Sequence, residues 1–178
     1  MKFTETKLKG AYIIEIEPME DERGFFARSF CKEEFEKLGL NSEIVQCNVS
    51  YNKKAGTLRG MHFQRKPYCE TKIVSCIKGA IYDVIIDLRE NSETFCKWEA
   101  VELTGNNFKM LYIPEGFAHG FQTLVDDTIV YYQMGNYYNS DYSDGVRWDD
   151  PAFDIKWLEC DNRIISDKDK SYLLRESL

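Results

Sequence analysis

The chain has 178 residues, 43% of them hydrophobic, which suffices for one buried core and is short for two, so we expect one domain over residues 1–178. Its 23 Lys and Arg residues against 30 Asp and Glu residues give a net charge of −7, which argues against non-specific binding to nucleic acid or to anionic membranes. The chain starts without an apolar signal-like stretch, and no run approaches the ~20 residues of a membrane span, so a cytoplasmic protein is expected.

Turn residues recur at short intervals along the chain, and the segments between them have the composition of short β-strands. Between two of these segments, Lys78 and Gly79 predict a tight hairpin turn. Several of the segments alternate apolar and polar residues, as half-buried strands do. We expect strands over Tyr12 to Ile16, Phe25 to Phe30, Lys72 to Ile77, Ala80 to Asp87, Trp98 to Leu103, Met110 to Ile113, Phe121 to Val125 and Ile129 to Met134.

Only two segments have the pattern of a helix. Lys32 to Leu38 is followed by Gly39, a typical C-terminal stop, and the tail from Ser166 onward starts with a capping residue. Many strands and few helices predict an all-β, antiparallel sandwich or jelly-roll barrel with a few short helices. The mouth or interior of such a barrel commonly holds a small-molecule site.

The six cysteines are scattered and form no Cys-x-x-Cys pair, so we expect reduced thiols. Cys69 and Cys76 lie near His62 in the sequence, which a catalytic thiol would require, but small core or half-exposed residues are the favoured interpretation.

Histidine is scarce, with His62 and His119 alone, and a metal site is the first chemistry to consider. His62, Glu70 and His119 could be ligands, and Pro114-x-Gly116-x-x-His119 resembles the second half of the cupin signature. Gln64, however, stands where a metal-binding cupin has the second histidine of His-x-His. The usual set of three histidines and a glutamate cannot be assembled, so we expect no metal.

Proton transfer is the second possible chemistry. His62 could act as a base near neutral pH, and Arg59 and Lys72 would bring positive charge beside it if their strands pair. A packed, hydrogen-bonded ring remains the alternative for a lone histidine. The tyrosines within residues 131–138 could supply an acid or simply pack in a strand, and Asp169, on spacing alone, is favoured as a helix-capping acid.

A set of short motifs occurs in order along most of the chain. They are Asp21-Glu22-Arg23-Gly24-Phe25-Phe26, Gln46-x-Asn48, Leu58-Arg59-Gly60-Met61-His62-Phe63-Gln64, Lys72, Gly79-x-x-x-Asp83-Val84, Ile113-Pro114-x-Gly116-Phe117-Ala118-His119-Gly120, Tyr132, Arg147-Trp148-Asp149-Asp150-Pro151 and Ser166-x-Lys168-Asp169. In order, spacing and joint presence they resemble the dTDP-4-dehydrorhamnose 3,5-epimerase family, a metal-free branch of the cupins. The resemblance implies one cupin-type jelly-roll domain that needs no cofactor.

The resemblance also implies a reaction, because the family acts on nucleotide-linked 4-keto-6-deoxy sugars of surface polysaccharide biosynthesis. The hydrogens on C3 and C5 lie next to the C4 ketone, so a base can remove either one if the enolate is stabilised, and reprotonation on the other face inverts the centre. By resemblance His62 is the base, oriented by Asp169, and Tyr132 is the acid. Lys72 supports the C4 oxyanion, with help from Arg59 or His119.

The resemblance further implies a nucleotide-diphosphate 4-keto sugar as the partner. Arg23, Arg59 and His119 would contact its diphosphate and sugar, and Arg23 would reach the site of a neighbouring subunit through an exchanged N-terminal strand, which makes a homodimer. The remaining substrate-binding candidates are Phe26, Arg28, Gln46, Asn48, Tyr138, Ser143 and Lys168.

Two positions depart from the family pattern, since Arg28 and Ser143 stand where the family has glutamates at the nucleotide end. A thymidine or a guanosine nucleotide therefore fits the sequence equally, and a GDP-linked 4-keto heptose is an alternative substrate. Inversion at C3, at C5 or at both stays open. So do two other functions, a sugar-nucleotide 3,4-ketoisomerase and a non-catalytic sugar-binding cupin.

Overall fold

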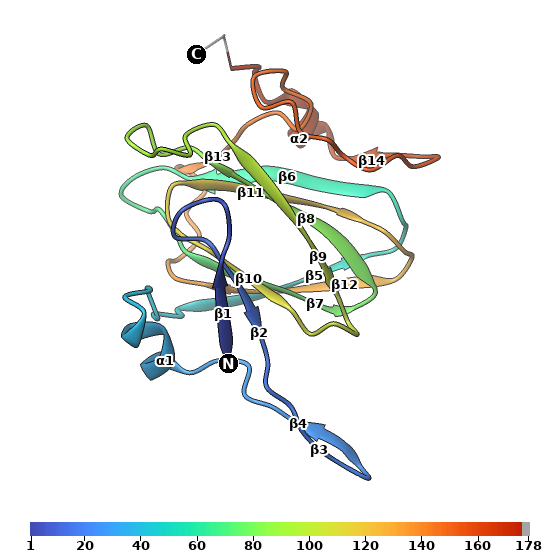
Figure 1. The fold of residues 1–178 in the computed structure, drawn as a ribbon. Helices are drawn as coiled ribbons and strands as arrows, with labels where there is room; N and C mark the ends of the chain where they lie inside the picture. Colours follow the sequence, from blue (N-terminus) through green and yellow to red (C-terminus); the bar gives the residue numbers. More distant parts are fainter. Residues whose placement is uncertain (176–178) are drawn as a thin grey trace.

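The computed structural model describes residues 1–175, and within them the chain forms two packed antiparallel sheets and a separate hairpin (Figure 1). The first sheet runs, in spatial order, β1 (Lys2–Glu5), β2 (Tyr12–Glu15), β10 (Met110–Ile113), β7 (Lys72–Lys78), β12 (Thr128–Met134) and β5 (Gln46–Asn52). The second runs β13 (Ser143–Gly145), β6 (Thr57–Gln64), β11 (Phe117–Thr123), β8 (Ala80–Asp87) and β9 (Trp98–Thr104), with β14 (Ile164–Ile165) parallel to β6. The hairpin is β3 (Met19–Asp21) and β4 (Gly24–Phe26).

The inner faces of the two sheets share a hydrophobic core. Val74 and Leu111 from the first sheet are fully buried against Ile85 and Phe121 from the second. Burying each such side chain stabilises the fold by about 1.5–3 kcal/mol. The arrangement confirms the expected all-β, cupin-type jelly roll.

The outer face of the first sheet is covered in part by α1 (Lys32–Lys37). Phe35, the fully buried residue of this helix, packs edge-on against Phe3 and Tyr112 with ring centroids 5.2 and 5.8 Å apart. The helix ends as predicted, because Gly39 adopts a φ of +70° and its N–H bonds the carbonyl of Glu36.

One predicted connection is wrong: Lys78 and Gly79 do not form a hairpin turn. The strand before them, β7, pairs with β10 and β12, whereas β8 after them pairs with β9 and β11 in the other sheet. Gly79 has a φ of +83°, and a Cβ atom there would collide with Thr128. Gly79 therefore lies where the chain passes from the first sheet to the second. Such a crossing and a tight hairpin turn both favour glycine, so the sequence alone does not distinguish them.

Other predicted boundaries shift for physical reasons. The strand expected over Phe25 to Phe30 ends at Phe26, where its three-residue pairing with β3 runs out. The strand expected over Phe121 to Val125 is β11, which begins four residues earlier at Phe117. The expected C-terminal helix is only the short α2 (Asp167–Ser171), and residues 176–178 of that prediction lie outside the described residues. None of the helices within residues 1–175 is long and apolar enough to cross a membrane.

Candidate active site

The interior of the barrel is polar at one end, where a cavity of about 300 Å³ opens between the two sheets. β5, β7 and β12 of the first sheet and β6 and β11 of the second contribute its walls. The cavity brings together six residues predicted from the sequence. It is lined by Asn48, Val49, Ser50, Arg59, His62, Lys72, His119, Phe121, Tyr132 and Met134.

His62, on β6, forms the first of two histidine–aspartate pairs. Its Nε2 atom lies 2.7 Å from Oδ1 of Asp169, which is presented by α2 and has a side chain only 6% exposed. The other carboxylate oxygen of Asp169 accepts the backbone N–H of Gly60 at 3.2 Å. Asp169 also takes part in helix capping, but through its backbone, since its N–H donates to Oγ of Ser166 at 3.1 Å.

The pKa of Asp169 is shifted by opposing effects. Burial raises it, but the hydrogen bond and charge of His62 and the N–H of Gly60 outweigh burial, and the pKa lies below its usual value. The carboxylate is therefore ionised at neutral pH. A charged partner at Nε2 fixes the tautomer of His62 and stabilises the imidazolium that forms when the ring accepts a proton.

His119, on β11, forms the second pair, with Asp83 on β8. Nε2 of His119 lies 2.7 Å from Oδ1 of Asp83, and both side chains are buried. Burial raises the pKa of Asp83 even though His119 and Lys72 oppose the shift. Asp83 was part of a motif in the sequence but was not predicted as a site residue. The available signal was a carboxylate in the middle of the apolar strand Ala80 to Asp87.

Tyr132, on β12, faces these histidines from the other sheet. Its ring packs edge-on against His119, with centroids 6.1 Å apart. Burial and the nearby charge of Asp83 raise the pKa of its phenol well above the ordinary value, although Arg59 and Ser50 act in the other direction. The phenol is therefore protonated at neutral pH, so it carries a proton that it can donate.

Lys72, on β7, supplies a buried positive charge at the cavity. Its ammonium group lies 3.1 Å from Oε1 of Glu70 and donates to the backbone carbonyl of His62 at 3.2 Å. Glu70 is therefore engaged by an ion pair. The other oxygen of Glu70 is buried without a hydrogen-bond partner among the described residues.

The three candidate metal ligands of the sequence have other partners in the structure. His62 and His119 bind aspartates, and Glu70 binds Lys72. Gln64 is buried and links β6 to two other segments. Its amide group donates to the carbonyls of Tyr68 and Tyr137, and its side-chain oxygen accepts the N–H of Asn139. Among residues 1–175, no cluster of three or more His, Cys, Asp and Glu side chains has an arrangement suited to a metal ion.

Hydrogen bonds link two residues of the cavity lining, Arg59 and Asn48, to neighbouring polar residues. Nε of Arg59 donates to Oδ1 of Asn52 at 2.8 Å. Gln46 donates to Asn48 at 3.2 Å and accepts the backbone N–H of Tyr138, whose ring is exposed. These contacts place Gln46, Asn48 and Tyr138 in one connected group.

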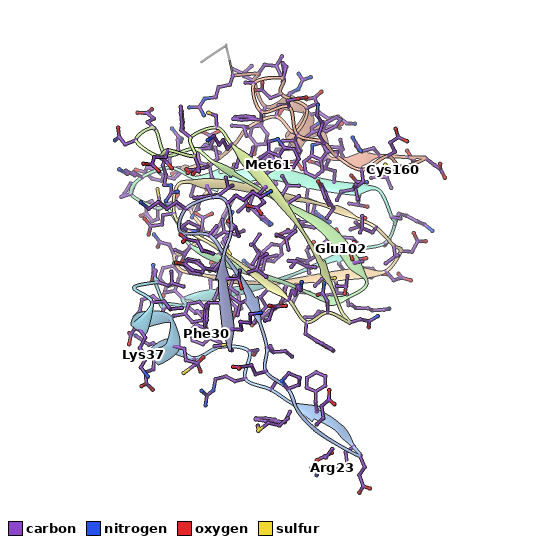
Figure 2. The ribbon with its side chains drawn as sticks, viewed as in Figure 1. Arg23, Phe30, Lys37, Met61, Glu102 and Cys160 are labelled. Atoms are coloured by element: carbon purple, nitrogen blue, oxygen red, sulfur yellow. The ribbon has the colours of Figure 1, made fainter. Side chains whose placement is uncertain are left out.

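Other predicted site residues lie outside the cavity of their own chain. Arg23 sits at the tip of the hairpin that projects from the barrel, as Figure 2 shows, and pairs there with Asp21. Phe26 is 71% exposed on the same hairpin, and Arg28 forms an ion pair with Glu34 at 2.7 Å.

Two further predicted residues, Ser143 and Lys168, flank the site without lining the cavity. Ser143 lies on β13 opposite Gln64. Lys168 is exposed on α2, one residue before Asp169. Neither is buried, so both remain open to contact with a ligand that extends beyond the cavity.

One small cavity of this cupin-type barrel is surrounded by a histidine–aspartate pair, a protonated phenol and an ammonium group. These groups are typical of an enzyme that catalyses proton transfer. The family model described as dTDP-4-dehydrorhamnose 3,5-epimerase matches residues 5–176. The chain belongs to this family and is a sugar-nucleotide epimerase, an isomerase acting on carbohydrates.

Individual relatives agree with this assignment. The dTDP-4-dehydrorhamnose 3,5-epimerase of Methanothermobacter thermautotrophicus is 46% identical over 180 residues, which cover 99% of this chain and 96% of the relative. The crystal structure of the Bacillus anthracis enzyme, with TDP and PPi bound, has a TM-score of 0.93 at 45% identity and covers 98% of this chain and 99% of that one. The Legionella pneumophila enzyme in complex with dTDP-4-keto-L-rhamnose has a TM-score of 0.90 at 35% identity, covering 96% and 90%.

Proposed function

We propose that this enzyme inverts both C3 and C5 of a dTDP-linked 4-keto-6-deoxy sugar. One observation carries the proposal: His62 projects into the cavity from the second sheet, and Tyr132 projects into it from the first. Inversion requires that a proton leave one face of a carbon and another arrive on the opposite face. Two proton carriers on opposite walls of one cavity meet that requirement.

In the proposed reaction His62 is the base. Because Nε2 is bonded to Asp169, Nδ1 is the nitrogen that accepts the proton from C3 or C5. The electron pair of the broken C–H bond moves into the C3–C4 or C4–C5 bond, and the negative charge develops on the C4 oxygen. The ionised carboxylate of Asp169 stabilises the imidazolium formed in this step.

The developing oxyanion lies in reach of positive charge and hydrogen-bond donors in the proposed complex. Lys72 is the principal donor, supported by Arg59 and His119, which line the same cavity. Tyr132 then donates its proton to the carbon from the other face, and the ketone is restored at C4. Each carrier regains its starting protonation state by exchange with water before the next inversion.

The nucleotide is proposed to be thymidine diphosphate. The relatives from Methanothermobacter thermautotrophicus and Bacillus anthracis carry dTDP-4-dehydrorhamnose in their names, and the structure from Bacillus anthracis holds TDP. Arg28 and Ser143 replace acids of the family pattern at the nucleotide end. Arg28 is neutralised by Glu34, so the charge change there is smaller than the sequence implies. A GDP-linked 4-keto heptose is the alternative to be tested.

We further propose that residues 1–178 form one domain and that the enzyme is a homodimer acting in the cytoplasm. Within residues 1–175 the strands of the β3–β4 hairpin pair only with each other, and Met19 and Phe26 expose apolar side chains there. Apolar surface of this kind favours a protein partner. Docking the hairpin of one subunit beside the cavity of the other would bring Arg23 to the diphosphate. The six free thiols fit a reducing compartment.

The test is solvent exchange. The enzyme is incubated in D2O with dTDP-4-keto-6-deoxyglucose and, separately, with a GDP-linked 4-keto heptose, and the products are analysed by NMR. We expect deuterium at both C3 and C5 of the dTDP sugar and a carbonyl still at C4. A carbonyl moved to C3 would indicate a ketoisomerase, and exchange of the GDP sugar alone would overturn the nucleotide assignment.

A further inference from the structure

The imidazole of His62 is held by more than its hydrogen bond to Asp169. The ring of Tyr172 packs edge-on against it, with ring centroids 6.1 Å apart and an interplanar angle of 67°. Tyr172 is the C-terminal cap of α2, three residues after Asp169, so one turn of chain presents both side chains to His62. The hydrogen bond fixes one nitrogen of the imidazole, and the aromatic contact restricts rotation of its plane.

A glycine makes room for this contact. Gly145, on β13, is the residue paired with His62 on β6. A Cβ atom on Gly145 would lie 2.5 Å from Cε2 and Cζ of Tyr172 and 2.6 Å from the carbonyl oxygen of Met61. Gly145 does not adopt a positive φ, so the backbone conformation does not require glycine here. Glycine is required because a larger residue would collide with these neighbours. The space is occupied by the ring that touches the base.

The hydroxyl of Tyr172 does not take part in holding the His62 imidazole. It is buried and has no hydrogen-bond partner among the described residues. Burial, followed by the charges of Asp169 and Asp144, raises the pKa of this phenol to about 12, so it is neutral at physiological pH. The aromatic ring is the part of the side chain that meets His62.

We propose that Tyr172 is a positioning residue, which holds the His62 imidazole in the one orientation from which it reaches both C3 and C5. The inference rests on the proposed function and adds a requirement to it. C3 and C5 lie on either side of C4, so one imidazole must serve two positions of the same sugar ring. A displacement of about 1 Å at a reacting group can cost on the order of 100-fold in rate.

The experiment compares three variants of the full-length enzyme: Tyr172→Ala, Tyr172→Phe and Leu173→Ala. Leu173 is the matched control, because it follows Tyr172 on the same segment and is 88% exposed. For each variant we measure kcat, KM, deuterium incorporation at C3 and at C5, binding of dTDP, and thermal unfolding. Binding of dTDP and thermal unfolding report whether a variant is folded, and the two incorporation rates report how His62 is oriented.

We expect Tyr172→Ala to bind dTDP normally and to lose about 10- to 100-fold in kcat, with KM changed less than about threefold and an altered C3 to C5 ratio. Tyr172→Phe and Leu173→Ala should stay within about twofold of the parent. The inference is overturned if folded Tyr172→Ala retains kcat and the parental ratio, or if Tyr172→Phe is as impaired as Tyr172→Ala. It is also overturned if activity falls only in proportion to dTDP binding. A parent enzyme that exchanges neither position would instead refute the proposed function.

Discussion

His62 and His119 are paired directly opposite each other on β6 and β11, yet each imidazole binds a different aspartate. Asp169 reaches His62 from the C-terminal helix, whereas Asp83 reaches His119 from the neighbouring strand of the same sheet. The side chain of His62 is 41% exposed, whereas that of His119 is buried. The two histidines are cross-strand neighbours, but one is partly exposed and the other is buried, so their environments suit different tasks.

Substitution of the two histidines separates these tasks. His62→Ala removes the proposed base and should lower deuterium incorporation at both C3 and C5 by about 10²–10⁴-fold. His119→Ala removes a donor to the substrate oxygen or diphosphate, worth about 3 kcal/mol of transition-state stabilisation, and should lower kcat/KM without abolishing exchange. NMR of the D2O reaction measures both. Deuterium incorporation at the parental rate in His62→Ala would contradict the assignment of His62 as the base.

Tyr132→Phe tests the two-sided nature of the reaction. The variant lacks the proton donor on the first sheet, but His62 can still remove a proton and return a deuteron to the same face. We expect deuterium in the sugar without inversion, so exchange should persist while epimerised product falls by about 10²-fold or more. Both are read from one NMR spectrum of the reaction in D2O.

Tyr131→Phe is the matched control for that variant. Tyr131 is the preceding residue of β12 and lines a separate surface cavity on the outer face of the sheet, with Ser75 and Ile77. It should epimerise as the parent does. Loss of exchange together with inversion in Tyr132→Phe would mean that Tyr132 has another role.

Several strands could be predicted from the sequence because their signals are local. The bounds of β8 and β10 agree with the prediction, and β2, β7, β9 and β12 differ by one residue at an end. These strands pack apolar side chains into the core, so apolar residues recur along them in a pattern that the sequence shows. The predicted helix over Lys32 to Leu38 was also marked locally, by Gly39.

The strands that build the site were harder to predict. On β5 the polar residues Asn48 and Ser50 line the cavity, and Asn48 is paired with Tyr132 across the sheet, so apolar alternation is lost where function requires polarity. The pairing of His62 with Asp169 joins residues 107 positions apart, and spacing alone favoured capping for Asp169. Only the family resemblance indicated that pair. Neither the spacing nor the resemblance assigned a role in the site to Asp83 or Tyr172.

Asp87 links stability to pH. This carboxylate is fully buried on β8 and accepts hydrogen bonds from Arg89, Ser92 and Thr94. Burial raises its pKa, but these donors outweigh burial and lower the pKa to about 2. Because the pKa is depressed in the folded state, the carboxylate stabilises the fold above pH ~4, and this contribution is lost as the pH falls toward 2.

We therefore expect Asp87→Asn to lower the free energy of unfolding by about 2 kcal/mol at pH 7 and to flatten its dependence on pH between 4 and 2. Urea unfolding at several pH values in this range measures the effect. Asp126→Asn is the control, since Asp126 pairs with Lys54 on the surface and should change stability little. A parallel pH dependence in Asp87→Asn and the parent would rule out this origin of acid sensitivity.

The proposed homodimer predicts that inactive chains can restore each other. Arg23→Ala should impair a site by removing the diphosphate contact supplied by the partner, and His62→Ala should inactivate its own site. In a mixed dimer, the chain with Arg23→Ala keeps His62 and receives Arg23 from the other chain, so one of two sites is intact. Purified heterodimers carrying different tags should recover about half the parental kcat, whereas each variant alone stays inactive or nearly so.

Lys54→Ala, which removes an exposed cation paired with Asp126, controls for the loss of surface charge and should remain active. If Arg23 served its own chain, neither site of the mixed dimer would be complete, and activity would stay at the level of the single variants.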